Sequence, residues 1–522
     1  MINRNRPTLT YIGFAGSVLF FAYWIFQSFY YIPHDFANSY FGSYFLLKGE
    51  FDTGIFDPYT FNKKIYDEGI KQVFASFNPN PPSVALFFSP FALLSLPMAK
   101  LSFNIFSSAL FMVCICRLCR HLKVESAMIF LLLPFVFFTP LRNQILFGQT
   151  YFLLFCLLTE GYLAYEKKNY LIASLLWSVA IFLKIFPAII ILFLIIKREW
   201  KMTLYLSSAC LIILFGCVLI QGIDIWTFYI KDVLTYSSTG KITLAYEPSF
   251  QSATMLFKFL FIADSSLNPQ TLADSTFLFY LCDAIFKTVI ISICAIYILR
   301  SKTILSFGIL FLGTILFLSY GSTYGNLLLV ILFVVLYSEL SLKRFAFISL
   351  ILLLVCNFPI SFFASFPALL KFPRLYLLLA LLAVLVYTIR VKFEWKPFAV
   401  FLPLFLLPAL FNSGNEPDRS TLLLDNQKHS LIYDYGVKGN SIVYYYWDGE
   451  GENSFDTGMQ SAAISFSDIE LTDNQIVYKE KKITNTADRK LKPGILNGNT
   501  IIYLSDKNRG IGFYTLRLIN LE

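Results

Sequence analysis

The sequence has little charge. Asp, Glu, Lys and Arg make up 14% of its 522 residues, whereas soluble domains average about 25%. In contrast, 57% of the residues are hydrophobic and the mean hydropathy is +0.64. Most side chains must therefore face lipid or one another, and a soluble globular protein is excluded.

Several motifs of soluble and energy-driven enzymes are also absent. There are three histidines in all, and no HExxH, Walker A, GxSxG or dinucleotide-binding motif occurs. A zinc protease and a nucleotide-driven transporter are therefore poor interpretations. The basic residues flank apolar runs and form no dense stripe, so we expect no nucleic-acid partner.

The nine cysteines all lie in or beside apolar segments. Cys114, Cys116 and Cys119 are spaced as in some metal sites, but no second pair accompanies them. Buried thiols that pack as small apolar side chains are the simpler interpretation. We therefore predict neither a disulfide framework nor a metal site.

What the sequence has in abundance is long apolar runs. Arg4 and Arg6 precede an uncharged run from Thr8 to Pro33, which exceeds the ~20 residues needed to cross a bilayer. It is too long for a signal-peptide core, so we expect a retained first span with its arginines on the cytoplasmic side. That orientation places His34 on the outer face.

Further apolar runs predict an all-α polytopic membrane protein with about 11–13 transmembrane helices. One run contains Lys184 and Pro187, which predicts either a kinked span or two half-helices. We assign residues 1–411 to this domain, with outer loops at 34–81 and 222–275, in the inner (plasma) membrane. The runs lie at 83–98, 101–119, 126–141, 150–165, 170–196, 202–221, 276–299, 303–320, 326–341, 345–363, 374–390 and 396–411.

The composition changes after Phe411. Alternating polar and apolar residues, separated by Asn, Gly and Asp, predict short β strands. Residues 412–522 are therefore expected to form a small β-rich domain outside the membrane, on the extracytoplasmic side. The predicted strands include Ser441–Trp447, Gln475–Tyr478, Thr500–Tyr503 and Gly512–Thr515.

The first polar residues after the first span are His34 and Asp35. A carboxylate in a partly desolvated pocket at the membrane boundary suits a general base that acts on an alcohol. The plainer alternative is an ordinary polar pair at the end of a membrane helix. Lys184 is costly to bury and should face a cavity or an anion, unless it reaches toward the membrane surface.

Other polar residues lie between apolar runs. Arg142 and Gln149 occupy one such connection, where an ordinary loop is the alternative. Gln251 and the patch that holds Tyr324 and Asn326 are equally compatible with helix packing.

In their order along the chain, several of these segments resemble glycosyltransferase family 87. The first two are His34-Asp35-Phe36 and Asn78–Pro82, and the next is Arg142-Asn-Gln144 with Phe147–Thr150. They are followed by Leu183–Pro187 and by Phe250-Gln251-Ser252. The resemblance extends over roughly residues 10–400. It implies a GT-C membrane fold and a mannosyltransferase-like enzyme that uses a polyprenyl-phosphate sugar.

The resemblance also implies an acidic catalytic base in the first outer loop, which corresponds to Asp35. The required chemistry suggests Arg142 and Lys184 for the donor phosphate and His34, Gln149, Gln251, Tyr324 and Asn326 for the substrates. We expect no cofactor or metal, a lipid-linked sugar donor, and a glycan or glycolipid acceptor. Two departures are the lack of histidine in the late outer loop and the C-terminal domain, which lies outside the family's common core.

A transporter or flippase of a lipid-linked or small solute is the main alternative. It would also have many spans, a broken helix and an intramembrane charge. The long first outer loop and the lack of an internal repeat argue against it. A membrane-anchored sensor is the third hypothesis, but so many apolar runs exceed what an anchor needs.

Overall fold

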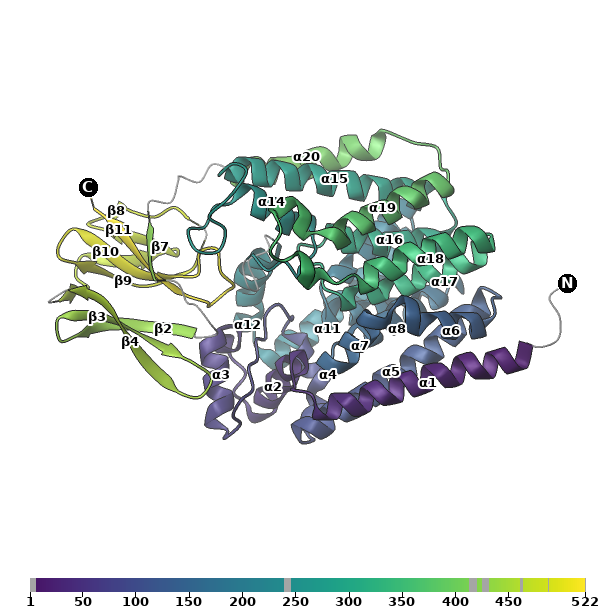
Figure 1. The fold of residues 1–522 in the computed structure, drawn as a ribbon, viewed down its shortest axis with the longest axis horizontal. Helices are drawn as coiled ribbons and strands as arrows, with labels where there is room; N and C mark the ends of the chain where they lie inside the picture. Colours follow the sequence, from purple (N-terminus) through teal and green to yellow (C-terminus); the bar gives the residue numbers. More distant parts are fainter. Residues whose placement is uncertain are drawn as a thin grey trace.

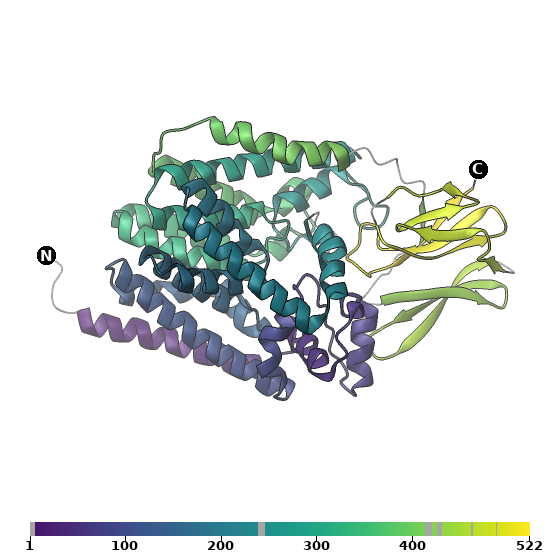
Figure 2. The same ribbon diagram turned by 180° about the vertical axis from the view of Figure 1, so that it is seen from behind.

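A computed structural model describes residues 6–238, 246–412, 420–424, 431–460, 463–486 and 488–521. The helices form one elongated body, and the β sheets lie at one end of it, beside α2, α3 and α12 (Figures 1 and 2). This mostly helical architecture with a C-terminal β-rich region confirms the predicted fold class. Which side of the membrane that end faces stays a prediction.

The α-helices have the following bounds: α1 (Arg6–Tyr30), α2 (Asp35–Lys48), α3 (Pro58–Asp67), α4 (Ser83–Ala92), α5 (Leu96–His121), α6 (Ser126–Val136), α7 (Phe138–Phe147), α8 (Tyr151–Glu166), α9 (Tyr170–Leu183), α10 (Ile189–Lys197), α11 (Trp200–Gln221), α12 (Ile223–Phe228), α13 (Thr235–Ser238), α14 (Ala253–Phe261), α15 (Thr276–Arg300), α16 (Thr303–Phe317), α17 (Leu329–Glu339), α18 (Leu342–Asn357), α19 (Pro373–Thr388) and α20 (Lys396–Asn412). Short 3₁₀ turns are η1 (Thr53–Phe56), η2 (Phe186–Ala188), η4 (Tyr324–Leu328), η5 (Ile360–Phe363) and η6 (Ala368–Lys371), and η3 (Tyr229–Leu234) is a π-helical turn.

Among the described residues, four helices are individually long and apolar enough to cross a membrane: α1 from Tyr11, α5, α11 and α15. The pair α6 and α7 could form a further span, although it is bent by 76°. Other apolar helices have only 10–17 residues. The predicted number of spans requires these shorter helices to cross as well, and it stays a prediction.

The predicted break in the apolar run 170–196 is confirmed. Helix α9 ends at Leu183, Lys184 adopts an extended conformation, and α10 begins at Ile189. Pro187 explains the interruption, because proline lacks the N–H that a continuous helix needs. The break exposes backbone polar groups in the body and leaves Lys184 at a helix end.

The β-rich region contains two larger sheets that share a core. Their orders are β1-β11-β10-β9-β5 and β2-β3-β4, with a third small sheet β6-β7-β8. Buried side chains from both larger sheets, such as Tyr435 and Ile502, form one hydrophobic cluster. The strands are β1 (Thr421–Leu424), β2 (Leu431–Lys438), β3 (Ser441–Trp447), β4 (Glu452–Gln460), β5 (Ile464–Ser465), β6 (Ile469–Thr472), β7 (Gln475–Tyr478), β8 (Lys481–Lys482), β9 (Lys490–Leu496), β10 (Thr500–Ser505) and β11 (Thr515–Asn520).

Three of the predicted strands are confirmed, as β3, β7 and part of β10. The strand predicted at Gly512–Thr515 is wrong. Ile511 and Gly512 form a turn, and regular pairing begins only at Thr515. Gly512 has a φ of +75°, a value outside the range of extended strands.

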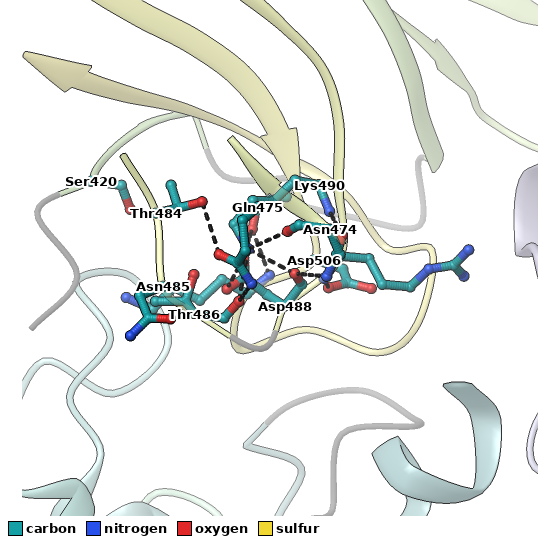
Figure 3. A network of polar contacts seen from close by, with 12 residues as sticks. Ser420, Asn474, Gln475, Thr484, Asn485, Thr486, Asp488, Lys490 and Asp506 are labelled. Carbon is teal, nitrogen blue, oxygen red and sulfur yellow. Dashed lines mark hydrogen bonds and ion pairs between the residues drawn. The ribbon is translucent and has the colours of Figure 1, made fainter. Parts of the chain in front are cut away.

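A buried lysine links three segments of this region. The Lys490 ammonium donates hydrogen bonds to the backbone oxygens of Asn474, Thr486 and Asp488 at 3.3, 2.9 and 2.9 Å (Figure 3). The Asp488 carboxylate accepts a hydrogen bond from Ser505 at 2.5 Å. Full hydrogen bonding of the ammonium offsets the cost of burying its charge.

A second carboxyl group is buried beside this network (Figure 3). Asp506 accepts hydrogen bonds from the backbone N–H groups of Arg489 and Gly512. Burial and the nearby Asp488 raise the pKa of Asp506 to about 7, although Arg489 opposes the shift. In the folded state Asp506 therefore binds its proton more tightly than in the unfolded chain.

Because the pKa of Asp506 is raised in the folded state, binding of its proton stabilises the fold at low pH. This stabilisation is lost as the pH rises toward about 7. Each pH unit in that window changes stability by up to ~1.4 kcal/mol. We expect amide protection in β10 to fall by about tenfold per unit between roughly pH 5 and 7. Hydrogen exchange, corrected for the intrinsic effect of pH, measures this. Protection that stays constant or rises would contradict the prediction.

Candidate active site

Asp35 lies at the start of α2, directly after the first membrane helix. Pro33 follows the end of α1, and His34 turns the chain with a φ of +51°. The helix dipole favours a carboxylate at this position. The His34 ring stacks on Phe147 at 3.9 Å, and its Nδ1 atom lies 3.1 Å from Asp35 Oδ1. The Asp35 side chain is 26% exposed, so substrate can reach it.

Gln149 reaches Asp35 from the connection between α7 and α8. Its side-chain amide donates a hydrogen bond to the Asp35 carboxylate. Gly148 ends α7 in a left-handed conformation, which turns Gln149 toward α2. Gln144 fixes the turn, because its amide donates to the Gln149 carbonyl and accepts from the Tyr151 N–H. The structure thus brings together Asp35 and Gln149, which were predicted separately as the catalytic base and a substrate-binding residue.

Two lysines place positive charge next to this carboxylate. Lys184 donates a hydrogen bond to Asn80 Oδ1 at 3.2 Å and lies 6.0 Å from the Tyr151 ring. Lys100, on α5, is buried and donates to the Ile32 carbonyl at 2.8 Å. Both ammonium groups interact electrostatically with Asp35. No hydrogen bond or ion pair with a carboxylate is present for either lysine in the described chain.

Lys100 was not predicted from the sequence. It is a single charge between the apolar runs 83–98 and 101–119, which was the available signal. The sequence places Lys100 in an apparent connection between two spans, whereas in the structure helix α5 begins before Lys100 and continues through it.

Tyr324 and Asn326 lie on η4. The Tyr324 hydroxyl faces Asp35, and its ring lies 5.3 Å from that of Tyr151. Asn326 is 1% exposed, and neither atom of its amide has a hydrogen-bond partner in the described part of the chain. A buried amide without partners is costly, so a polar group of a ligand or a water molecule would stabilise it.

The described contacts of Arg142 and Gln251 do not include Asp35 or the two lysines, and the buried Arg142 Nε has no hydrogen-bond partner in the described residues. The Arg142 guanidinium lies 5.2 Å from the Trp24 ring, and no described hydrogen bond or ion pair connects it to Asp35 or Lys184. Both N–H groups of the Gln251 amide donate to backbone carbonyls, those of Pro248 and Lys371, at 2.7 Å. Gln251 therefore holds the second outer loop in place. Neither of its side-chain N–H groups remains free to donate a hydrogen bond to a substrate, although substrate binding was predicted.

An apolar cavity of about 560 Å³ lies beside these residues, between α15, α16, α20 and the segment 185–189. Its walls include the ion pair Asp283–Lys287, with 2.6 Å between the charged atoms. A smaller hollow shares Phe186, Leu318 and Tyr320 with the cavity and is also lined by Tyr151. The cavity therefore adjoins the group of residues around Asp35.

In the described residues, no group of three or more His, Cys, Asp or Glu side chains could hold a metal ion. The geometry instead offers one carboxylate, two ammonium groups and a tyrosine hydroxyl. A carboxylate in this setting can accept a proton from an alcohol, and fixed cations can stabilise a departing anion. Metal independence stays a prediction.

The model of glycosyltransferase family 87 matches residues 78–321. This match confirms the family resemblance predicted from the order of the motifs, and the family implies a membrane glycosyltransferase. The matched segment includes Asn80, Lys100, Gln149 and Lys184, whereas Asp35 precedes it. No curated protein and no solved structure matches the chain significantly.

The close packing of the turn at Gly148 against α2 can be tested by substitution. A Cβ atom there would lie 2.6 Å from Phe36 Cβ, next to Asp35, whereas a Cβ at Gly49 meets no atom within 4 Å. Both glycines have positive φ. Gly49→Ala should cost ~1 kcal/mol from backbone strain alone.

Gly148→Ala should cost a further ~1–3 kcal/mol because of the clash with Phe36. Thermal unfolding of the two variants in the same detergent measures the difference. Equal losses would show that Gly148 does not hold α7 against α2.

Proposed function

We propose that this membrane glycosyltransferase moves a sugar from a polyprenyl-phosphate donor to a hydroxyl group of a glycan or glycolipid acceptor. The reaction takes place at the outer face of the plasma membrane. In this orientation the β-rich region also lies on the extracytoplasmic side. The observation that supports it best is the position of Asp35. Its carboxylate interacts electrostatically with the ammonium groups of Lys100 and Lys184, and a hollow lined by Tyr151 connects this group of residues with the apolar cavity.

In the proposed reaction Asp35 accepts the proton of the acceptor hydroxyl. The hydroxyl oxygen attacks the anomeric carbon, a new C–O bond forms, and the bond to the phosphate oxygen breaks. The phosphate leaves with the bonding electrons, so a single displacement inverts the anomeric configuration. The transition state resembles an oxocarbenium ion, and negative charge grows on the phosphate.

Lys184 and Lys100 are the proposed partners of that negative charge. Fixed cations in a site that excludes water stabilise developing charge strongly, because they need no reorganisation during the reaction. Lys184 has only a neutral amide oxygen, that of Asn80, as its described hydrogen-bond partner. Asn326, with its unpaired amide, is the proposed partner of a sugar hydroxyl.

The cavity supports a lipid donor. Its lining is mostly apolar, and α15 and α20 border it on the side of the helical body that Figure 2 shows uppermost. Each CH₂ group buried there contributes about 0.8 kcal/mol, so the first isoprene units of a donor would add considerable affinity. Lys287 and Asp283 form a polar pair on the cavity wall, where an amphiphile's charged end could also bind.

Replacement of the base is the direct test. With a radiolabelled polyprenyl-phosphate sugar and an acceptor extract, Asp35→Asn should lower kcat by about 10²–10⁴-fold, the usual contribution of general base catalysis. Asp224→Asn, an exposed acidic residue at the start of α12, should leave kcat unchanged. Full activity of Asp35→Asn would refute its assignment as the base. Movement of intact donor across vesicles without sugar transfer would favour a flippase instead.

The cavity is tested by changing its volume. Ala284 on α15 is buried in its wall, and Ala284→Phe should raise KM for a long-chain donor by about tenfold, since it displaces several buried CH₂ groups. A donor with a short chain should show no change, and Ala284→Ser should behave as wild type. An equal effect on both donors would mean that the chain does not bind in this cavity.

A further inference from the structure

The β-rich region does not simply hang from the helical body. The loop between β10 and β11, residues 506–514, here called the anchor loop, inserts into it. Ile511 is fully buried and belongs to the hydrophobic cluster of the helices. A Cβ atom at Gly512 would lie 2.4 Å from Pro58 Cδ, at the start of α3. The loop therefore packs as closely against the first outer loop as residues pack in a core.

The anchor loop also holds the second outer loop. The Arg509 guanidinium lies 3.0 Å from the Asp264 carboxylate and 3.0 Å from the Ser266 hydroxyl. Burial raises the pKa of Asp264, but the contacts with Arg509 outweigh this effect and hold that pKa well below its usual range. The pair is nearly inaccessible to water, so removing one partner would leave a buried charge.

Further contacts surround the anchor loop. Arg489, at the edge of β9, lies 5.2 Å from the Phe228 ring and interacts electrostatically with Asp57. On α3, the Tyr59 ring stacks on Tyr433 at 4.0 Å, with the planes 8° apart. The β-rich region thus contacts both outer loops at several points, which favours one fixed orientation over a flexible attachment.

From these contacts a short path leads to the site. Phe56, next to Asp57, packs against Phe228 at 5.7 Å between ring centres. Its carbonyl accepts a hydrogen bond from the Asn78 side chain at 2.7 Å. Two residues further on, Asn80 Oδ1 accepts the hydrogen bond from the Lys184 ammonium.

We propose that the anchor loop is a positioning element of the active site. It clamps the two outer loops together, fixes the segment Asn78–Asn80, and through Asn80 holds Lys184 where the donor phosphate binds. Arg509, Ile511 and Gly512 act through this path and contact no substrate. The role of Lys184 rests on the proposed function, whereas the clamp itself does not.

Hydrogen exchange tests the clamp without any activity. Gly512→Ala introduces a methyl group against Pro58, so exchange in residues 56–82 should become at least about tenfold faster. Gly498→Ala is the matched control, because Gly498 has a similar φ of +77° but no atom within 4 Å of its Cβ position. It should leave residues 56–82 unchanged. Equal exchange in the two variants would overturn the clamp.

The ion pair gives a second, independent variant. Arg509→Ala should accelerate exchange in both outer loops, and Arg509→Lys, which keeps the charge, should restore at least part of the protection. If Arg509→Ala exchanges like wild type, the ion pair does not hold the second outer loop.

Steady-state kinetics test the link to Lys184. Asn80→Ala and Gly512→Ala should both lower kcat/KM for the donor by about tenfold and leave the acceptor KM little changed, because Lys184 is proposed to stabilise the charge that develops on the donor phosphate. Faster exchange in residues 56–82 with an unchanged kcat/KM for the donor would overturn the positioning role. If wild type transfers no sugar from any polyprenyl-phosphate donor, the proposed function fails while the exchange result still decides the clamp.

Discussion

The site depends on charges that would be unstable alone inside an apolar body. Asp35 interacts electrostatically with the ammonium groups of Lys100 and Lys184, and neither lysine forms an ion pair with a carboxylate in the described residues. Burying a single charge costs several kcal/mol, so Asp35 stabilises both lysines, whereas the two ammonium groups repel each other. Two cations against one anion leave an excess positive charge. That excess positive charge makes the site suitable for a phosphate. For the three groups to act on one substrate, the surrounding backbone must hold all of them in place with little freedom.

The backbone meets this requirement through interruptions of its helices. His34 turns between α1 and α2, Gly148 ends α7 in the left-handed region, and Lys184 is extended between α9 and α10. Continuous helices would point these residues along separate faces of the body. Because each break leaves polar backbone groups without helical partners, side chains such as Gln144 occupy them. The same breaks therefore create the site and need the hydrogen bonds that stiffen it.

The sequence was informative where a signal is local. A charge and a proline within an apolar run predicted the break at Lys184, and the order of the motifs predicted the family. It was less informative where the partner is distant. Whether Arg142 and Gln251 face a substrate depends on which helix packs against them, and periodicity does not encode this. Lys100 was missed for the same reason. The strand predicted at Gly512–Thr515 is a turn because the anchor loop packs on α3, and the sequence does not encode this contact between residues far apart in the chain.

The segment that matches the family carries the cations and Asn80 but neither Asp35 nor the anchor loop. Its polar groups alone would form an anion site without a base. Asp35 reaches that site through Gln149, which belongs to the matched segment, while Asn78, two residues before Asn80, is held from outside the segment by the Phe56 carbonyl. Phe56 belongs to the first outer loop and packs on Phe228 of the second. A loop that binds a substrate must open readily, yet it must also hold Lys184 still. The anchor loop resolves this conflict, because it holds the two loops through Pro58, Asp264 and Ser266 and makes no described contact with Asp35 itself.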